Sequence, residues 1–411
     1  MAIPSVSVQF DFSNSPTFGY TFTIGDPNHG IIGVDTLGDV ASDIVDISDQ
    51  VGKISIRRGY NLLQDQFQAG TATIRVYDPT GKWNPQNTSS VYYGKLLPLR
   101  KIRVTANTKF LFSGYTIAYN YTYPSKEQDI GFVDIECSDA FRLFNMANVS
   151  TVTGAVAGET TGQRIDRILN TVSWPTSMRS IATGNTTVAA DPGTVRTSLS
   201  AIKNIEFCEQ GAFYVSPTGN AIFLNRKAII QKSGANPTSF ANDGTGIGYK
   251  NIVFNFDDKL IINQTNVTRS GGTLQNAFNS SSITKYFPHS INFTDILVQT
   301  DSDALDIART YVATRAETTI RIDAMTLDLS TPDYATGIAA AIGLDFFDTV
   351  AIKNVGQDGT VIQKTLQCMG FQHEITPNSF NTTITTSEPI VDGFIMDSSL
   401  YGIIGTSVMT Y

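Results

Sequence analysis

Hydrophobic and polar residues alternate in short runs along two long stretches of the chain, the first covering residues 51–145. Its runs are rich in β-branched and aromatic residues: KISIRRG, TATIRVYD, KIRVTA, KFLFSGYTIAYNYTY and IGFVDIECSD. Such partial alternation is typical of strands with one buried face. The turn-forming sequences DPTGK, ANTK and YPSKEQ separate the runs. This succession of short strands predicts a barrel or sandwich.

A helical spacing of apolar residues follows in two segments. The first is TGQRIDRILNTV (161–172), with Thr161 as the expected N-cap and the Trp-Pro at 174–175 as its end. The second is TVRTSLSAIKNIEFCEQ (194–210), whose stripe is formed by Val195, Leu199 and Ile202. The next segment, AFYVSPTGNAIFLNR, has the pattern of a strand, a turn and a strand. Together they predict a small α+β unit.

The alternating pattern returns after a segment rich in Gly, Ser and Asn at 232–248, which we expect to be a linker. One helix interrupts the second β-rich stretch. Its sequence is SDALDIARTYVATRA, with Thr300 or Asp301 as the cap. The fold class expected is therefore mainly β with an α+β insert. The predicted divisions are an N-terminal arm with one or two strands (1–50), a first β-barrel-like domain (51–150), a small α+β domain (151–235), a second β-barrel-like domain (236–388) and a C-terminal arm (389–411).

Composition adds limits to this picture. A chain of 411 residues has room for two to four domains, at ~100–200 residues each. Charged residues are 16% of the chain, below the ~25% typical of soluble domains, which suits surfaces covered by neighbouring subunits. The net charge is −8 and no Lys/Arg run stands out, so the usual electrostatic signature of nucleic-acid binding is missing.

Cysteine spacing and hydropathy bear on the redox state of the protein's compartment and on whether the chain spans a membrane. Cys137, Cys208 and Cys368 are far apart and odd in number, which argues against a disulfide framework and for small buried side chains in a reduced compartment. The N-terminal sequence lacks the pattern of a signal peptide. The most apolar stretch, ATGIAAAIGLDFFDTVAI, contains two aspartates and is too short for a bilayer. We therefore expect no membrane-spanning segment.

Candidate chemistry is sparse. The sequence HEITP at 373–377 has Pro377 where a zinc-protease helix needs its second histidine, so we expect His373 on a half-buried strand. The acidic residues Asp301, Asp303 and Asp306 lack the glycine and glutamate of a calcium loop, and a helix N-terminus accounts for them. GTGIG at 244–248 is not a dinucleotide motif. We predict no catalytic, cofactor-binding or metal site, no cofactor, and a protein that is not an enzyme.

Aromatic residues are clustered on expected strands, as Tyr92 and Tyr93 and as Tyr119, Tyr121 and Tyr123. Packing in a core or an interface is favoured over stacking on sugars or bases.

The stretch ISIRRGYNLLQDQFQAGTATIRVYDPTGKWNPQNTSSVYYGKLLPLRKIRV (54–104), followed by FLFSGY, resembles the N-terminal region of minor tail proteins of long-tailed siphophages. The resemblance is carried by these blocks: Arg58-Gly59, Phe67 to Thr73, Trp83-Asn84-Pro85, Tyr92-Tyr93-Gly94, Leu97 to Val104 and Phe112 to Tyr115. Two further blocks agree, the helix and hairpin of 195–226 and the sequence GFQHEITPNSFNTTITTSEP at 370–389.

This resemblance implies a tail-tip or baseplate hub, similar to the central hub of contractile phages, with two tube-like β-barrels in each subunit. Three copies would form a pseudo-sixfold ring that continues the hexameric tail tube. The expected partners are further copies of the chain, the tail tube or distal tail protein, the tape measure protein, and tail fibre or receptor-binding proteins, with genome DNA only passing through the lumen. The expected location is the distal end of the tail in the virion, after assembly in the host cytoplasm.

Three alternatives stay open. The chain could be a distal tail protein that forms a hexameric ring, a module that binds glycans or receptors on the host surface, or a cell-wall hydrolase. Within the leading hypothesis, the segment 60–69 is expected to meet adjacent subunits, so that its deletion blocks assembly without unfolding the subunit.

Overall fold

The computed structural model describes residues 3–13, 43–123, 130–233 and 235–389. The first β region contributes these strands: β1 (Val6–Asp11), β2 (Ile44–Asp46), β3 (Val51–Asn61), β4 (Gln66–Tyr77), β5 (Lys101–Ala106), β6 (Lys109–Thr122) and β7 (Phe132–Ser138), with a short 3-10 helix at Ser48–Gln50. The strands are paired in the order β3-β4-β7-β6-β5-β1-β2, with antiparallel neighbours. One or two strands were expected in the N-terminal arm; two, β1 and β2, are present and join this sheet.

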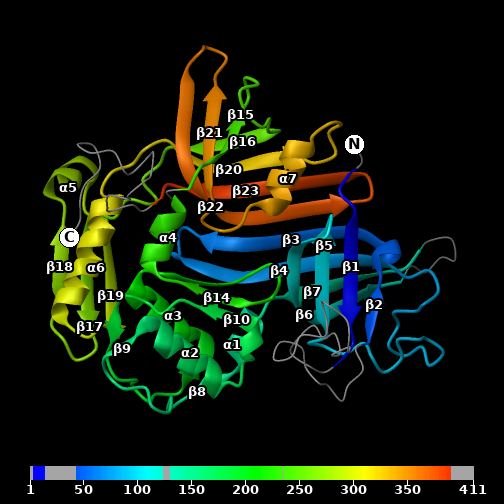
Figure 1. The fold of residues 1–411 in the computed structure, drawn as a ribbon, viewed down its shortest axis with the longest axis horizontal. Helices are drawn as coiled ribbons and strands as arrows, with labels where there is room; N and C mark the ends of the chain where they lie inside the picture. The colour runs from blue at the N-terminus through cyan, green and yellow to red at the C-terminus, as the bar shows by residue number, and fades with distance from the viewer. Residues whose placement is uncertain (1–2, 14–42, 124–129, 234, 390–411) are drawn as a thin grey trace.

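The second β region continues the same sheet (Figure 1). Its strands are β15 (Thr238–Ala241), β16 (Asn251–Asn255), β20 (Arg321–Asp328), β21 (Thr349–Val355), β22 (Val361–Thr376) and β23 (Ser379–Ser387). They extend the path as β16-β20-β23-β22-β3, since β22 pairs antiparallel with β3. The mainly β character is confirmed. Among the described strands, however, the two β regions form one open thirteen-stranded sheet, in which no pairing closes a barrel.

The α+β unit expected between the two β regions is present below the central strands in Figure 1. Its helices are α1 (Phe141–Met146), α2 (Thr161–Thr171), α3 (Ser198–Glu209) and α4 (Arg226–Ser233), with a 3-10 helix at Thr176–Met178. Its strands are β8 (Asn148–Val149), β9 (Glu159–Thr160), β10 (Arg179–Ile181), β11 (Thr187–Val188), β12 (Arg196–Thr197), β13 (Ala212–Val215) and β14 (Ala221–Leu224). The predicted hairpin is β13–β14, with antiparallel register.

Three local predictions in this part of the chain are wrong. The cap of α2 is Thr160, not Thr161, because the Thr160 hydroxyl and the Gln163 side chain satisfy each other's backbone N–H groups in a capping box. Helix α3 begins only at Ser198, so Val195 lies outside it and is 77% exposed. The expected linker 232–248 contains β15, which pairs in parallel with β21.

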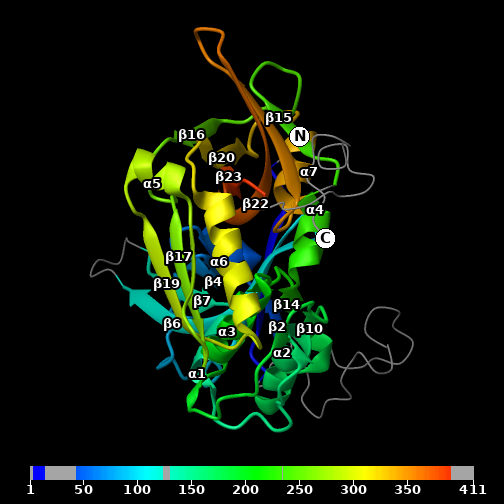
Figure 2. The same ribbon diagram turned by 90° about the vertical axis from the view of Figure 1, so that its left-hand side faces the viewer.

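A second α+β unit, which the sequence pattern did not indicate, lies within the second β region. Strands β17 (Gln264–Arg269), β18 (Gln275–Phe278) and β19 (Ser290–Ile296) form a separate sheet in the order β18-β17-β19. Helix α6 (Asp301–Arg315) packs along one face of this sheet (Figure 2), and α5 (Ser280–Tyr286) lies at its end. As expected, Thr300 caps α6. The apolar stretch after 334 contains the short helix α7 (Ala335–Gly343).

One hydrophobic core runs through both β regions and the first α+β unit, and it includes buried residues of α6 and β19. In the part of the chain that the structure describes, no helix is long and apolar enough to cross a membrane. The predicted C-terminal arm, the GDPNHG sequence and most of the expected YPSKEQ turn lie outside the described residues.

Candidate functional site

The two β regions meet where β3 lies against β22, and two glycines face each other at this seam. Gly59 and Gly370 are register partners. A Cβ added to Gly59, whose φ is +156°, would lie 2.6 Å from the Cα of Gly370. The backbones therefore approach more closely than any side chain permits. The glycine of the Arg58-Gly59 block thus has a structural role in joining the regions.

Arg58, the other residue of this block, is buried beneath the seam and is only 7% exposed. Its Nη2 donates to the carbonyl of Val215 in the α+β unit at 3.0 Å, and its guanidinium lies 4.8 Å from the Phe346 ring centroid. Burial lowers the pKa of Arg58, although the carboxylates of Asp345 and Asp139 oppose this shift. One side chain therefore connects β3, β13 and the segment before β21.

Asp139 is the carboxyl group with the most altered environment near this junction. Burial raises its pKa to about 7, against hydrogen bonds from the backbone N–H groups of Gly70 at 2.6 Å and Phe141 at 3.0 Å. A Cβ on Gly70 would lie 2.8 Å from Asp139 Oδ2, which explains the glycine of the Phe67 to Thr73 block. A shifted pKa is a sign of a functional site only in an accessible setting. Asp139 is buried and held by the backbone, so its role is to fix the end of β7.

His373 lies on β22, as the sequence predicted, with its side chain buried. Its Nδ1 is 3.0 Å from the Thr382 hydroxyl, and its ring stacks 6.5 Å from that of Phe371. Burial, followed by the charge of Arg58, lowers the pKa of His373 to about 3, so the imidazole is neutral. Among the described residues, no three His, Cys, Asp or Glu side chains are grouped so that they could hold a metal.

The acidic residues at the start of α6 are occupied by separate partners. Asp301 accepts from Arg269 Nε at 2.6 Å and from the Thr273 hydroxyl at 2.7 Å. Asp303 completes the capping box with Thr300. Asp306 is exposed on the outer face. These contacts agree with the helix-terminus interpretation made from the sequence.

The Trp-Asn-Pro and Tyr-Tyr-Gly blocks pack within the first β region. Trp83 is fully buried, and its Nε1 donates to the Gln50 side chain at 3.0 Å. The ring of Tyr92 lies 4.9 Å from that of Trp83, which confirms the packing role predicted for it. Tyr93, in contrast, is 52% exposed.

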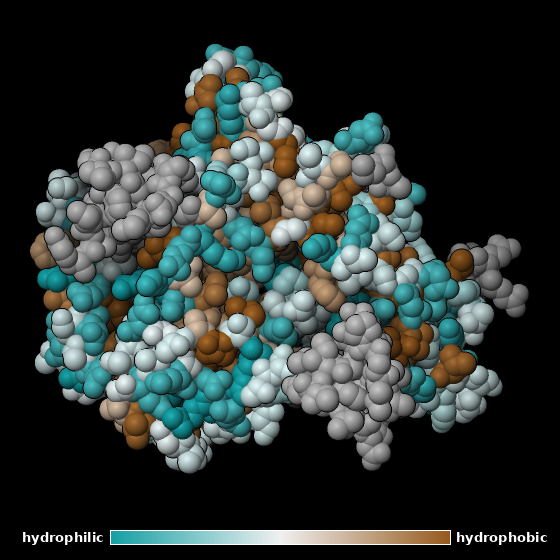
Figure 3. All heavy atoms as spheres, in the orientation of Figure 1, coloured by the Kyte–Doolittle hydropathy of each residue, from teal (hydrophilic) through white to brown (hydrophobic). Residues whose placement is uncertain are grey.

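A cleft of about 370 Å³ lies between the β3–β4 turn, α3, α4, α6 and the ends of β20, β22 and β23. Aromatic rings from three elements form one wall, because Phe293 lies 4.5 Å from Phe207 and 5.1 Å from Tyr311. Ile229 and Met369 line another part of it. Figure 3 shows hydrophobic and hydrophilic residues side by side over this part of the molecule. The lining of the cleft therefore combines apolar side chains with charged ones, among them Glu206, Arg226 and Asp323.

Asp65, in the β3–β4 turn, binds two residues of α6 at the edge of the cleft. One carboxylate oxygen accepts from Arg315 Nη2 at 2.5 Å and from the Tyr60 hydroxyl, and the other accepts from the Tyr311 hydroxyl. Burial raises the pKa of Asp65, but the charge and hydrogen bond of Arg315 and the two hydroxyls outweigh it, so that the pKa is lowered. No signal in the sequence links residue 65 to residues 311 and 315.

This contact changes the interpretation of the segment 60–69. The segment packs on its own chain, and it includes the buried Phe67 as well as Asp65. Its deletion would therefore damage the subunit itself, and the assembly test expected from the sequence cannot be made in that form. Leu63, which is 72% exposed, is an apolar residue of the turn that can meet another molecule.

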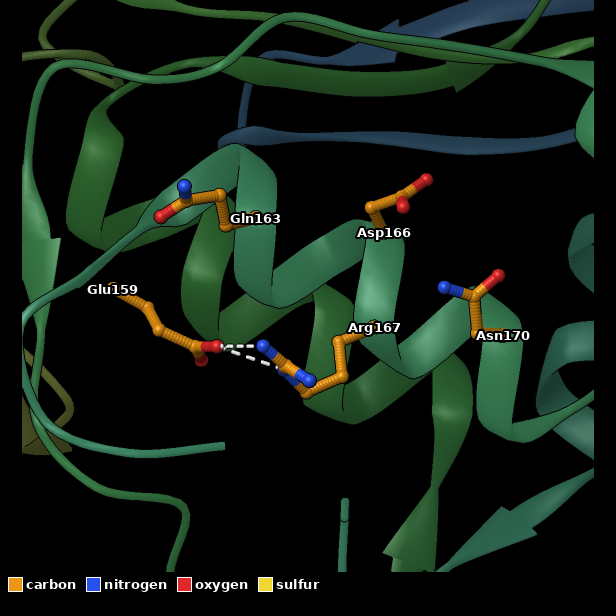
Figure 4. Close-up of a pocket in the computed structure, with 5 residues that line it drawn as sticks. All are labelled: Glu159, Gln163, Asp166, Arg167 and Asn170. Carbon is orange, nitrogen blue, oxygen red and sulfur yellow. Dashed lines mark hydrogen bonds and ion pairs between the residues drawn. The ribbon is translucent and has the colours of Figure 1, made fainter. Parts of the chain in front are cut away.

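A second, shallow pocket lies on α2 and is polar throughout (Figure 4). Both of its carboxylates have partners: Glu159 accepts from Arg164 Nε at 2.7 Å and from Arg167, and Asp166 forms an ion pair with Arg179 at 3.1 Å. Arg164 also donates to the carbonyls of Val156 and Ala189. Figure 4 shows Asp166 directed away from Glu159. Glu159 is thus bound by two guanidinium groups, which explains how β9 and α2 are held together.

Exposed apolar side chains gather near both ends of the sheet path. At the β16 end, Phe256 follows the last paired residue and Ile320 precedes β20, and they are 68% and 42% exposed. At the β2 end, the loop 91–99 carries exposed apolar residues: Val91, Tyr93, Leu97 and Leu99. Lys95 of this loop forms an ion pair with Asp43, just before β2, at 2.6 Å. Figure 3 shows hydrophobic surface over the loops beside β1 and β2.

Comparisons with known proteins find likeness in fold but not in sequence. No family model matches the chain, and no curated protein matches it. The tail protein from Neisseria meningitidis MC58 matches with a TM-score of 0.55 and 10% identity, over 82% of this chain and 92% of that one. The 43 kDa tail protein of prophage MuSo2 from Shewanella oneidensis matches with a TM-score of 0.56 and 10% identity, over 84% of this chain and 96% of that one. The resemblance seen in the sequence blocks is thereby confirmed as a shared fold.

Proposed function

We propose that this chain is a structural subunit of a long-tailed phage tail and forms a hub ring at the distal tip. The observation that carries the proposal is the fold, which is shared with two tail proteins over more than four fifths of the chain. In this role the chain is not an enzyme and needs no cofactor. The hub caps or continues the tail tube and anchors the other proteins of the tip.

The open sheet supports a ring. In the described structure, β16 and β2 lie at the ends of the sheet path and each pairs along one edge only. Unpaired edges with exposed apolar neighbours are suited to contact with another subunit. Because the two ends differ, contact between them is head-to-tail, and repetition of such a contact closes a ring if the rotation permits.

Copy number follows from the two β regions. If neighbouring subunits complete each region into a tube-like β-barrel, one subunit supplies two of six positions, and three copies surround the lumen. The net charge of −8 suits a lumen that DNA passes without being held. The proposed neighbours are the tail tube or distal tail protein, the tape measure protein, and tail fibre or receptor-binding proteins. The alternative of a hexameric distal tail protein uses the same edges with six copies.

The purified chain provides the first test. Native mass spectrometry should find a species of three times 44.6 kDa, and immunogold labelling of virions should mark the distal tail tip. A sixfold species would instead support the distal tail ring. A chain that stays monomeric at all concentrations, together with virions that carry no label, would contradict the structural proposal.

A variant tests the sheet end. Phe256→Asp places a charge at an exposed apolar position, so it should leave the fold intact and shift the assembly toward monomer. Val195→Asp is the matched control, because Val195 is 77% exposed and lies in the α+β unit, in neither of the strands that end the sheet path. Wild-type assembly by the Phe256 variant would show that this end is not an interface.

A further inference from the structure

We propose that the face of the sheet β18-β17-β19 opposite α6 is a binding surface for a neutral polysaccharide of the bacterial cell surface. This surface, called the amide face below, lies on the second α+β unit. The bacterial source of the ligand rests on the proposed tail role, whereas the site itself belongs to the single subunit and does not depend on the number of copies in a ring.

The amide face is the side of the sheet on which α6 does not pack. Thr265 and Val267 of β17 are fully buried, and α6 packs against β17 and β18 on their side. Side chains that alternate with these two residues point the other way. The register places six of them in two rows across the three strands: Phe278, Gln264 and Ser290 in one row, and Asn276, Asn266 and Asn292 in the other. Four of the six are exposed.

The amide groups of the second row are hydrogen-bonded in series. Asn276 Nδ2 donates to Asn266 Oδ1, and Asn266 Nδ2 donates to Asn292 Oδ1, each at 2.6 Å. In the first row, the Ser290 hydroxyl donates to Gln264 Oε1 at 2.9 Å. A carboxamide has two N–H donors and two acceptor lone pairs, so each amide keeps hydrogen-bonding capacity for a ligand. Because these bonds fix the amides beforehand, binding costs less side-chain entropy.

The charge of the ligand follows from the side chains of this face. None of the six described residues in the two rows is charged, so the rows offer a phosphate, a sulfate or a nucleic acid no opposite charge. The exposed face of the large sheet differs, because it carries ion pairs such as Lys53 with Glu374 at 3.5 Å and Arg75 with Asp134 at 2.8 Å. The core of a protein interface is rich in aromatic and apolar side chains, and here one phenyl ring stands among five polar groups. Sugar hydroxyls both donate and accept hydrogen bonds, as amides do, so a neutral sugar is the ligand that matches the two rows.

Phe278 adds the apolar contact that sugar rings use. It lies on the edge strand β18 and is 62% exposed. An exposed aromatic ring offers a flat apolar surface with a negative face, on which the C–H groups of a sugar ring can pack. Neighbouring strands are ~4.7–4.9 Å apart, which is close to the length of one sugar unit. A glycan that crosses the strands can therefore meet successive amides while one of its rings covers Phe278.

A printed array of neutral and acidic oligosaccharides from bacterial cell surfaces, probed with the purified full-length chain, tests the proposal. The chain should bind at least one neutral oligosaccharide. In titration calorimetry with that oligosaccharide, Asn292→Ala and Phe278→Ala should each weaken binding by about fivefold or more, since each removes one contact. Both side chains are exposed, so the unfolding midpoints should stay close to that of wild type.

Asn120→Ala is the matched control. Asn120 is an exposed asparagine on β6 of the large sheet, and its amide donates to Glu136 at 2.7 Å. This variant should bind as wild type does. A readout without substitutions is hydrogen exchange, which the saturating oligosaccharide should slow in β17 and β18 but not in β6.

Three outcomes would overturn the proposal: no binding to any neutral oligosaccharide, equal affinities for wild type and both amide-face variants, or slower exchange confined to other strands. Binding to acidic oligosaccharides alone would also overturn it. Native mass spectrometry reads the assembly separately, so a failure of glycan binding leaves the hub proposal standing, and a failure of assembly leaves the amide face to be judged by the array.

Discussion

Replacement of Asp65 by Asn tests the contact that holds the β3–β4 turn on α6. The change keeps the shape of the side chain and removes its charge. Arg315 then keeps its guanidinium beside the cleft without its carboxylate partner at 2.5 Å. Tyr60 and Tyr311 lose a charged acceptor for their hydroxyl groups. We therefore expect α6 to open from the rest of the subunit more often.

The free-energy cost of Asp65→Asn follows from how deeply the ion pair of Asp65 and Arg315 is buried. Loss of one partner of a fully buried ion pair costs about 3–5 kcal/mol. Here the two side chains are 18% and 21% exposed, so water screens part of the interaction, and we expect about 2–3 kcal/mol. Since ~1.4 kcal/mol corresponds to a factor of ten, amides of α6 that exchange by local opening should exchange roughly 30 to 150 times faster.

Hydrogen exchange with mass spectrometry is the suitable assay, because a chain with several regions need not unfold in one step. Asp306→Asn is the matched control on the same helix. Asp306 is 67% exposed and lies 3.7 Å from Arg309, so its loss should change exchange by no more than about twofold.

The pH dependence has a definite sign. The pKa of Asp65 is lowered in the folded protein, so its contribution is complete above the unfolded value of ~3.9 and is lost as pH falls through the folded value. The difference between wild type and Asp65→Asn should therefore be constant from pH 7 to about 5 and shrink in more acidic solution. A difference that persists unchanged in acid, or a variant with wild-type exchange in α6, would refute this reasoning.

Two further predictions concern the seam and its histidine. Gly59→Ala should destabilise the protein by about 1–3 kcal/mol, because its Cβ would lie 2.6 Å from the Gly370 Cα. The control Gly248→Ala has open space around it and should change the urea midpoint of unfolding little. Equal midpoints for both variants would contradict the close approach of the two glycines. Burial keeps the pKa of His373 at about 3, below the unfolded value of ~6.5, so wild-type stability should fall by up to about 1.4 kcal/mol per pH unit as pH drops below 6.5. His373→Gln, which can keep the contact with Thr382, should show a shallower fall in unfolding midpoint between pH 6 and 4, and identical slopes would contradict this assignment.

Local patterns were sufficient for much of the secondary structure. Local alternation, turn residues and capping residues predicted the hairpin at 212–226, the helix capped by Thr300 and most strands of the two β regions. The same holds for His373, since alternation along β22 places it on a strand without a second histidine nearby. Where local signals were weak, prediction failed, as for β15 in a Gly- and Asn-rich segment and for the inserted sheet β18-β17-β19.

The sequence by itself determined the mainly β class, the α+β insert, the lack of a metal-binding motif and the blocks that resemble tail proteins. Only the tertiary structure decided that β3 pairs with β22, because that pairing depends on register and packing between residues more than 300 positions apart. It also brought Asp65 to Arg315 and buried Asp139, which alters the pKa of both carboxyl groups. Burial and long-range contacts are properties of the folded chain, and the periodicity of the sequence does not predict them.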